Sequence, residues 1–238
     1  MKNQYFGDIN DYRKYGLLRA LQANGECGLL VAWMLTPDDG SGDGRLRGYL
    51  QDADTWMVHD PVLFKGLASL LRQTSTPAVA LIEESGLLAR TSYYSAVVPD
   101  ARQDRDAWRR GLLAAARGVD LVFLDPDNGI EVPSKPVGRK GSSKYVTWQE
   151  IEGLWEAGSS VLTYQHFRRE RHSTFAERMT SALRERTGAR LVAALRTPRV
   201  LFLLAAQERD EARVEKALAR IRERWQPQMM CLAGSPAA

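Results

Sequence analysis

The stretch VDLVFLDPDNGIE, from Val119 to Glu131, is an apolar run that leads directly into a group of polar residues. Residues 119–125 have the length and the aliphatic content of a buried strand. The residues DPDNG (125–129) close this run, so two carboxylates and a carboxamide stand where the predicted strand ends. Because Asp, Asn and Gly are also the usual residues of turns, this stretch by itself leaves an ordinary turn and a functional site both open.

The patterns on either side of this stretch alternate between strand and helix. Apolar runs predict strands over 28–35, 78–85, 89–98, 119–125, 159–167, 189–197 and 199–207, and amphipathic runs predict helices over 8–22, 60–73, 105–118, 147–158, 174–188 and 209–225. Three helix starts carry capping signals: Asp8 or Asn10 for the first, Asp60 before Pro61 for the second, and a capping box of Thr147 and Glu150 for the fourth.

This alternation predicts the fold class. Strands that alternate with helices form a mostly parallel sheet with helices on both faces. The last two strands are separated by little more than Pro198, so we expect them to form an antiparallel hairpin. The sequence therefore predicts a doubly wound α/β fold with a C-terminal antiparallel hairpin. We expect one domain over residues 1–238, with a basic loop insertion at 132–144 and a frayed tail at 227–238.

The overall composition restricts the class of protein. With 44% hydrophobic and 26% charged residues among 238, the chain has enough apolar side chains for a core and is not disordered. It has no apolar run long enough to cross a membrane, no apolar signal segment near the N-terminus, and only two distant cysteines, which predicts a reduced cytoplasmic protein. A net charge of +4 is compatible with a nucleic-acid partner without requiring one. The oligomeric state stays open.

Three of the predicted strands end in polar loops. These loops are TPDDGSGDG (36–44), DPDNG (125–129) and YQHFRR (164–169). In open α/β sheets, ligands bind in the crevice at the carboxyl ends of the strands. We therefore expect the three loops to converge and to form one site.

The order of elements, together with a strand that ends in Asp-Pro, resembles the class I S-adenosylmethionine-dependent methyltransferases. The Asp-Pro pair is similar to the first half of the [DN]PPY motif of adenine-N6 methyltransferases, and the closest similarity is to the family that methylates an adenine of large-subunit ribosomal RNA. That family also opens with a helix rich in Asp, Lys and Leu, similar to FGDINDYRKYGLLRAL (6–21). A strand and a Gly-x-Gly loop follow in the family, similar to LLVAWMLTPDDGSGDG (29–44). The element order covers most of the chain, and the residue similarity covers these short stretches.

The resemblance implies a methyltransferase that acts on a nucleic acid or a nucleotide-like substrate. Asp125 would orient the acceptor amino group, and Tyr145 or Tyr164 would replace the motif's aromatic residue, because Asp127 and Asn128 stand where the family has Pro and Tyr. The cofactor would be S-adenosylmethionine. Resemblance and strand ends together predict catalytic residues Asp125, Pro126, Asp127, Asn128 and His166; cofactor-binding residues Asp38, Asp39, Gly40, Ser41, Gly42 and Glu83; and substrate-binding residues Lys14, Tyr164, Arg168 and Arg169.

Two alternative functions remain open on the same residues. Asp125, Asp127 and Glu131 would form an oxygen-rich site for Mg²⁺ or Mn²⁺, as in a metal-dependent nuclease or phosphotransferase. The spacing of Glu131 and Lys135 differs from the usual (Asp/Glu)-x-Lys nuclease pattern. The second alternative is a nucleic-acid-binding protein without catalytic activity on the same fold.

Overall fold

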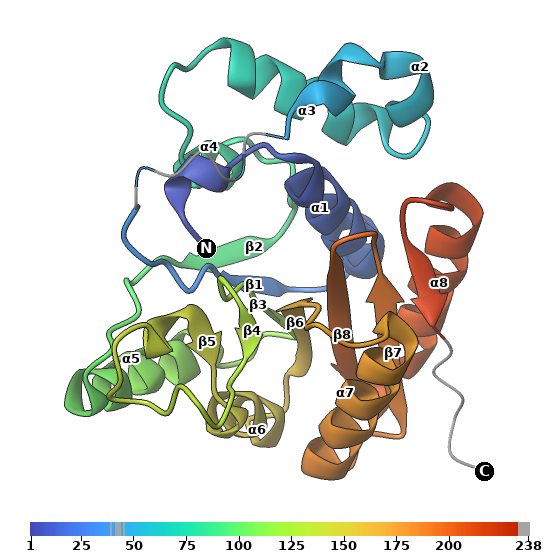
Figure 1. Ribbon diagram of the computed structural model, residues 1–238. Helices are drawn as coiled ribbons and strands as arrows, with labels where there is room; N and C mark the ends of the chain where they lie inside the picture. The colour runs from blue at the N-terminus through green and yellow to red at the C-terminus, as the bar shows by residue number, and fades with distance from the viewer. Residues whose placement is uncertain (39, 41–43, 45, 233–238) are drawn as a thin grey trace.

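A computed structural model describes residues 1–38, 40, 44 and 46–232 (Figure 1). Its central sheet has seven strands in the order β2-β1-β3-β6-β8-β7-β9. The strands are β1 (Leu29–Ala32), β2 (Thr91–Tyr94), β3 (Leu121–Leu124), β6 (Ser160–His166), β7 (Leu191–Arg196), β8 (Val200–Ala206) and β9 (Met230–Leu232). The short strands β4 (Gly129–Ile130) and β5 (Tyr145–Val146) pair with each other in parallel beside it.

Strand directions confirm the predicted doubly wound sheet. β1 pairs in parallel with β2 and with β3, and β3 pairs in parallel with β6. β8 runs antiparallel to both of its neighbours, β6 and β7, so the predicted C-terminal hairpin is confirmed. The chain moves from β1 to one side to form β2 and then crosses to the other side to form β3. The point where the strand order reverses therefore lies between β1 and β3.

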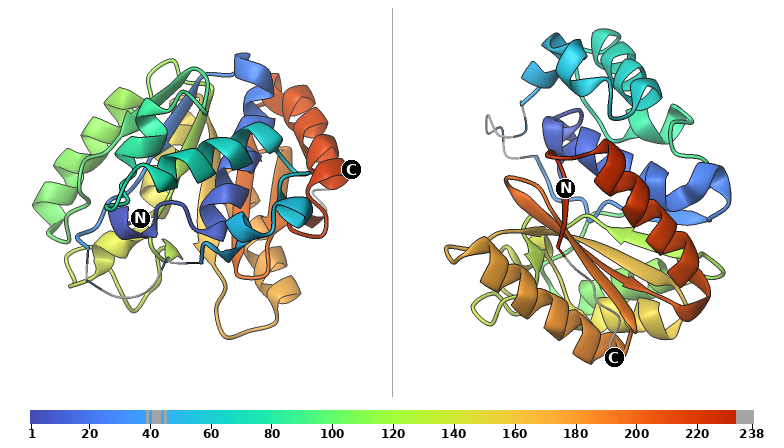
Figure 2. Two further views of the ribbon diagram at one scale, coloured as in Figure 1. Left: turned by 90° about the horizontal axis from the view of Figure 1, so that it is seen from above. Right: turned by 90° about the vertical axis from the view of Figure 1, so that its right-hand side faces the viewer.

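Helices cover both faces of the sheet (Figure 2). The helices are α1 (Ile9–Gln22), α2 (Ala53–Trp56), α3 (Pro61–Arg72), α4 (Ala80–Glu84), α5 (Arg102–Ala115), α6 (Trp148–Glu156), α7 (His172–Thr187) and α8 (Glu211–Arg224), with 3₁₀ turns η1 (Asn3–Tyr5), η2 (Ala23–Gly25), η3 (Gly48–Gln51), η4 (Ser142–Lys144) and η5 (Glu208–Asp210). One hydrophobic core joins α1, α3, α4 and α8 to the sheet, and a second joins α5, α6 and α7 to the other face. In β1 and β3, alternate residues enter alternate cores, as the two-residue repeat of a strand requires.

The predicted helix starts are confirmed. Asp8 accepts hydrogen bonds from the backbone N–H groups of Asn10 and Asp11 and caps α1, and Asp60 caps α3. Thr147 and Glu150 form the predicted capping box of α6. Glu150 also binds Arg105 of α5 through two short contacts, so one side chain both starts α6 and fixes it to its neighbour.

Two local predictions are wrong. Residues predicted as a strand over 78–85 contain helix α4, because Val79 and Ile82 are buried three positions apart, which is a helical spacing. The apolar run was too short for its period to separate the two structures. The predicted frayed tail is partly wrong, because β9 pairs with the outer edge of β7 and Met229 before it is fully buried. Residues 233–238 lie outside the described residues.

The basic loop insertion at 132–144 is held mainly by Asp100. The carboxylate of Asp100 accepts hydrogen bonds from the backbone N–H groups of Gly141 and Ser143. This contact holds the end of the loop, so that Lys144 follows it at a defined place. Within the described parts of the chain, no helix is long and apolar enough to cross a membrane.

Candidate functional site

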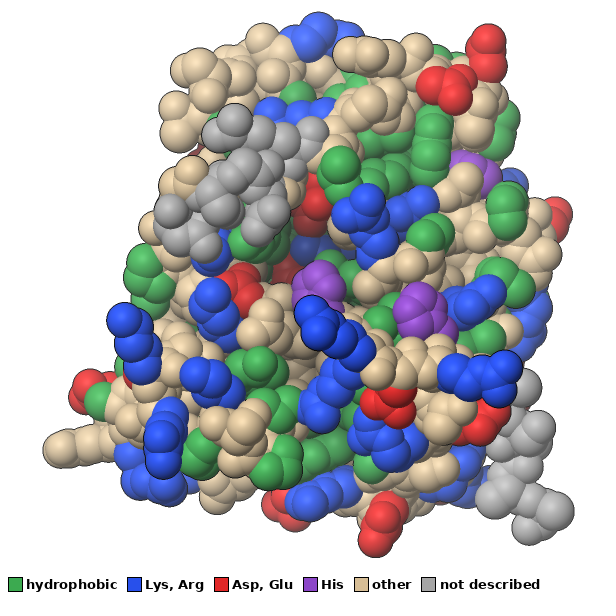
Figure 3. Space-filling model, viewed as in Figure 1, with side chains coloured by type: hydrophobic (Ala, Val, Ile, Leu, Met, Phe, Trp, Pro, Cys, Tyr) green, Lys and Arg blue, Asp and Glu red, His purple; other side chains and the backbone are tan. Residues whose placement is uncertain are grey.

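A cleft of about 690 Å³ lies at the carboxyl ends of β3 and β6. On the face of the molecule that it occupies, Lys and Arg side chains gather around a hollow (Figure 3). Its volume is in the usual range for small-molecule sites. The lining residues come from the N-terminal segment, α1, the loop after β1, the loop after β3, the end of β6 and the β7–β8 turn: Met1, Lys2, Tyr5, Asp8, Asn10, Asp11, Lys14, Gly44, Leu46, Asp125, Pro126, Asp127, Asn128, Lys144, Tyr164, His166 and Arg199.

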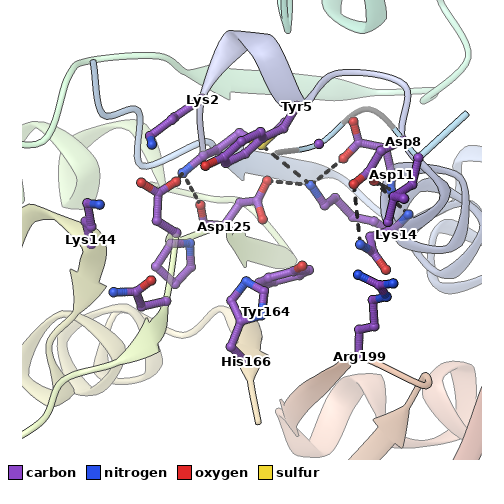
Figure 4. A pocket seen from close by; sticks show the side chains of 17 residues that line it. Lys2, Tyr5, Asp8, Asp11, Lys14, Asp125, Lys144, Tyr164, His166 and Arg199 are labelled. Carbon is purple, nitrogen blue, oxygen red and sulfur yellow. Dashed lines mark hydrogen bonds and ion pairs between the residues drawn. The ribbon is translucent and has the colours of Figure 1, made fainter. Parts of the chain in front are cut away.

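Lys14 forms the centre of the cleft (Figure 4). Its Nζ donates to Oδ1 of Asp11 and to Oδ2 of Asp125, each at 2.7 Å, and all three side chains are buried. Asp11 stands one helical turn before Lys14 on α1, and Asp125 is the first residue after β3. Burial by itself lowers the pKa of Lys14, but the two carboxylates outweigh burial and raise it above its usual value. Lys14 is therefore a cation that bridges α1 and the sheet.

One carboxylate oxygen of Asp125 is hydrogen-bonded to Lys14, and the other can accept a further hydrogen bond. Its backbone N–H donates to Ala32 O, so the residue continues the pairing between β3 and β1 by one position. Oδ2 accepts from Lys14, and no group among the described residues donates to Oδ1. Burial raises the pKa of Asp125, against the attraction of Lys14. A carboxylate oxygen at the cleft without a donor is suited to accept a hydrogen bond from a ligand N–H or O–H.

The loop after β3 is fixed by backbone contacts. Asn128 N donates to Lys144 O, and Asn128 O accepts from His166 N. Gly129 has φ 112°, and a Cβ atom there would lie 2.4 Å from the side chain of Gln165. Only glycine allows this close approach without strain. The loop that carries the polar residues of the motif is therefore rigidly attached to the end of β6.

Met1 occupies the crevice between the ends of β1 and β3. Its amine donates to Met34 O and Asp125 O, and it forms an ion pair with Asp127 at 2.7 Å. The other oxygen of Asp127 accepts from Thr36 Oγ1. Burial would raise the pKa of Asp127, but the amine, Thr36 and Lys2 together lower it below its usual value. Asp127 therefore serves to fix the N-terminal segment against the end of β1.

Asp8 is a further carboxylate in the cleft, and it also caps helix α1. It is 7% exposed and caps α1 through Oδ1. Burial, and then the neighbouring charge of Asp11, raise the pKa of Asp8 to about 7. Asn10, two positions after Asp8, also lines the cleft, and its buried Oδ1 has no hydrogen-bond partner among the described residues. Asp8 is therefore a cleft residue whose charge changes near neutral pH.

The cations lie at the two ends of the cleft. Lys2 and Lys144 are on one side of the aspartates, and Arg199 is on the other (Figure 4). Between them, the ring of Tyr164 packs edge-on against His166 with 5.2 Å between centroids. His166 stands at the exposed mouth, but the protein atoms around its ring lower its pKa below the usual value, against the attraction of Asp127. The cleft thus has carboxylates in the middle, aromatic and imidazole rings beside them, and cations at both ends.

The structure brings together the predicted residues on the loop after β3, on α1 and on β6. Those in the cleft are Lys14, Asp125, Pro126, Asp127, Asn128, Tyr164 and His166. Arg168 and Arg169 are exposed beyond β6 and do not line the cleft, because the chain turns away toward α7 after His166. Tyr145, the other predicted aromatic, does not line it either.

The predicted cofactor residues are not brought into the cleft as expected. Glu83 was expected at the end of a strand, but it lies on α4, where its Oε1 accepts from Trp33 Nε1 and Ser95 Oγ. Asp38 and Gly40 are exposed and do not line the cleft. The predicted residues Asp39, Ser41 and Gly42 lie outside the described residues.

The predicted metal-binding group is not assembled. Glu131 Oε1 accepts from Trp148 N at the start of α6, so Glu131 does not join Asp125 and Asp127 in the cleft. Its side chain is directed to the unpaired N–H groups of the α6 start instead. In the described ranges, no group of three His, Cys, Asp or Glu side chains has an arrangement that could hold a metal ion.

Several cleft residues were not predicted from the sequence. They are Met1, Lys2, Tyr5, Asp8, Asn10, Asp11, Leu46 and Arg199. A signal existed for two of them: Asp8, Asp11 and Lys14 recur every three residues, which places polar side chains along one side of a helix. The N-terminal segment and the β7–β8 turn carry no comparable pattern, since only the folded chain brings them to β3.

Comparisons with known proteins do not assign this chain to a family. A scan against protein-family models finds no match, and a search of the curated proteins finds none either. Fold and site define the class: a doubly wound α/β protein with a charged cleft at the carboxyl edge of its sheet. Its function has to be argued from the chemistry of that cleft.

Proposed function

We propose that this protein is an enzyme that methylates an amino group on a base of a nucleic acid, with S-adenosylmethionine as the methyl donor. The observation that supports this most is the state of Asp125 in the cleft, with Oδ2 hydrogen-bonded to Lys14 and Oδ1 without a donor among the described residues. A fixed carboxylate with one available oxygen can accept a hydrogen bond from an amino N–H and so orient the nitrogen lone pair.

The middle of the cleft suits a base with an amino group. Carboxylates accept hydrogen bonds and donate none when they are ionised, so Asp125, and Asp8 above its pKa of about 7, favour a ligand that presents N–H groups. Tyr5 and Tyr164 line the same space and offer rings on which a base taken out of its stack can pack. A base that carries only carbonyl oxygens at this edge would face repulsion from the same carboxylates.

The two ends of the cleft suit the phosphates on either side of such a base. Lys2 and Lys144 lie at one end of the cleft and Arg199 lies at the other (Figure 4). Contacts from Lys and Arg to phosphates position a nucleic acid without reading its sequence. This arrangement supports a polynucleotide strand, or a nucleotide, rather than an uncharged small molecule.

The charge of the methyl donor suits the cleft, and part of the loop expected to bind the donor lines the cleft. It carries a sulfonium and an ammonium group, and Asp8, Asp11 and Asp125 supply more negative charge than Lys14 neutralises. The loop after β1, where the resemblance places cofactor contacts, reaches the cleft through Gly44 and Leu46. When bound, the cofactor would supply an electrophilic methyl group. Asp8, Gly44 and Leu46 would hold it, and Glu83 would not, since it is bound to Trp33 and Ser95.

The roles of the protein's own residues follow from their contacts. Asp125 would accept the N–H of the acceptor amino group, and Lys14 would keep that carboxylate in place. Tyr164 would pack against the base, and the backbone of the 125–129 loop, tied to Lys144 and His166, would limit its movement. The reversed strand β8 between β6 and β7 is a further similarity to the class I methyltransferase sheet.

The test is a binding and transfer experiment with a substitution at Asp125. Calorimetry with S-adenosylmethionine and its demethylated product should give saturable binding, and at 100 times the dissociation constant the ligand should stabilise the fold by about 2.7 kcal/mol. Transfer of a labelled methyl group should be measured to RNA and DNA from cells that lack the gene. Asp125→Ala should lower transfer by about 10²–10³-fold, while cofactor affinity stays within about twofold.

The controls separate this proposal from the two alternatives. Asp104→Ala, at an exposed position of α5, should leave transfer unchanged. If Mg²⁺ or Mn²⁺ stabilises the protein and S-adenosylmethionine does not, methyl transfer is wrong and phosphodiester chemistry should be examined. If nucleic acid binds and neither cofactor nor metal does, the protein is a binding protein without this activity.

A further inference from the structure

A second cavity, of about 530 Å³, lies between α1, α3 and α8. Helix α1 packs against both of the other helices (Figure 1). The cavity is lined by His59 between α2 and α3, by the first residues of α3, by the C-terminal half of α1 and by the last turns of α8. Among the described residues, it shares no lining residue with the cleft at the carboxyl edge of the sheet. The function proposed above therefore leaves this cavity unexplained.

His59 places a fixed imidazole ring at this cavity. It is 7% exposed, its ring stacks on Trp225 with 5.2 Å between centroids, and Trp56 packs edge-on against it. Its Nδ1 lies 2.5 Å from Arg224 O, and because a carbonyl oxygen only accepts, Nδ1 carries the hydrogen. Its Nε2 has no hydrogen-bond partner among the described residues and is not fully enclosed by protein atoms. Since His59 lines the cavity, Nε2 is the ring nitrogen that a ligand can reach.

Two arginines of α8 line the same cavity. Arg220 and Arg224 are exposed, and the side chain of neither makes a hydrogen bond or an ion pair with a described residue. They are four positions apart on α8, so their side chains leave the helix on the same side. Two guanidinium groups without a protein partner therefore stand beside the cavity that contains the His59 ring.

The other charged groups of the lining leave the cavity positive. Arg19 Nε donates to Asp60 Oδ2 at 2.7 Å, and Asp60 Oδ1 accepts from Leu63 N, so both oxygens of Asp60 are occupied. The remaining carboxylate of the described lining, Glu223, is exposed. Three arginines thus face two carboxylates before His59 is counted. Helix α3 also begins at the cavity, and the N-terminal end of a helix favours anions.

We propose that this cavity binds a phosphate group, carried by a phosphate monoester or present as inorganic phosphate. The guanidinium groups of Arg220 and Arg224 can each bind two phosphate oxygens. His59 Nε2 can donate to a phosphate oxygen when the ring is protonated, and can accept from a P–OH group when it is neutral. A carboxylate has two oxygens in one plane, so it can engage fewer of these three groups at once. The site is independent of methyl transfer at the cleft.

The experiment follows the imidazole signals of the whole protein by NMR. The sequence has three histidines, His59, His166 and His172, so their signals can be assigned by single substitutions. Titration with inorganic phosphate and with phenyl phosphate, at constant ionic strength, should shift the His59 signal saturably and leave the His172 signal unchanged. Acetate tests a carboxylate in the same way and should bind at least about tenfold more weakly, because it engages fewer donors.

Substitutions on α8 test the two guanidinium groups. Arg220→Gln and Arg224→Gln should each weaken phosphate binding about tenfold, since each removes a charge-assisted contact. Arg222→Gln is the matched control, because Arg222 is exposed on the same helix and does not line the cavity, and it should change the affinity by less than about twofold. His59→Gln should also weaken binding, measured by calorimetry. If that variant does not fold, the α8 variants still decide the matter.

Three results would overturn the site: a His59 signal that phosphate does not move, phosphate affinity that is unchanged in both Arg220→Gln and Arg224→Gln, or equal affinity for acetate and phosphate. A response of the His166 signal alone would place phosphate in the cleft and would also contradict this cavity. Dimethyl phosphate that binds as tightly as phenyl phosphate would show that the assignment to a monoester is wrong. Tighter binding of phenyl phosphate than of inorganic phosphate supports a monoester as ligand, and the reverse order supports free phosphate.

Discussion

At the scale of single residues, Lys14 is the side chain on which the cleft depends. It neutralises Asp11 and Asp125, which are buried with it, and it lies 5.4–5.9 Å from the ring centroids of Tyr15, Trp33 and Tyr164. Lys14 is therefore a structural requirement for the carboxylate as well as a component of the site.

Replacing Lys14 by Met should strongly destabilise the fold. Removal of one partner leaves Asp11 and Asp125 as buried charges without compensation, which costs about 3–5 kcal/mol in comparable pairs. The free energy of unfolding should be measured by urea denaturation. Lys65→Met, at an exposed position of α3, is the control and should change it by less than about 0.5 kcal/mol. A loss below about 1 kcal/mol for Lys14→Met would contradict the buried bridge.

Asp8 predicts a specific dependence of stability on pH. Its pKa is about 7 in the folded protein and about 3.9 in an unfolded chain. Between these values the folded state holds a proton that the unfolded state has lost, so Asp8 makes the protein less stable as pH rises from about 4 to about 7. Above pH 7 both states are ionised and the loss is complete.

Asp8→Asn should remove this slope and keep the helix cap, because Asn caps helices as well as Asp does. The stability of the variant relative to the native protein should increase between pH 4 and pH 8, by up to about 4 kcal/mol. Urea denaturation across this range measures it, and Asp52→Asn, at the N-cap of α2, controls for the same exchange at another cap. A difference that does not change with pH would show that Asp8 keeps an ordinary carboxylate pKa.

At the scale of elements, α1 carries the charged residues in the middle of the cleft. Lys14 and Asp11 line the cleft, and Asp8 caps the helix beside them. The helix is covered on most sides, because α8 packs on it where a Cβ atom at Gly16 would lie 2.0 Å from Trp225. Charged residues on such a helix are buried with it, which is why each of them needs a partner.

The contact between α5 and α6 supports the loop beneath the cleft. Arg105 binds both oxygens of Glu150 and also donates to Tyr145 O, just after Lys144. Arg105→Met should cost about 3–5 kcal/mol in unfolding free energy, because Glu150 would stay buried without its cation. Arg186→Met breaks the half-exposed pair that Arg186 makes with Glu152 and should cost about 1 kcal/mol or less. Equal losses in the two variants would contradict the role of burial.

At the scale of the whole molecule, the sheet order decides where the cleft forms. The strand order reverses between β1 and β3, and the ends of these strands meet the N-terminal segment there. β8 returns antiparallel beside β6, so the β7–β8 turn with Arg199 comes to the same edge as His166. The carboxyl edge thus receives side chains from both ends of the chain.

The sequence predicted the fold class because its signals are local. Helix caps at Asp8, Asp60 and Thr147 and the hairpin at Pro198 depend on neighbouring residues, and the structure confirms them. The segment at 78–85 was predicted wrongly because a short apolar run fits a strand and a buried helical turn equally well. β9 was missed because its pairing depends on the open edge of β7, which no local pattern reveals.

The sequence alone determined that polar residues follow the third sheet strand and that strands and helices alternate, since both depend on spacing along the chain. Only the tertiary structure decided which polar groups meet there. Lys14 reaches Asp125 over 111 positions, and Arg199 and Lys2 join them from opposite ends of the chain. Such contacts follow from strand order and from the burial of charge, which are properties of the folded chain. For the same physical reason Glu83 and Glu131 lie outside the cleft. Glu83 accepts a hydrogen bond from Trp33, and Glu131 accepts one from the backbone at the start of α6.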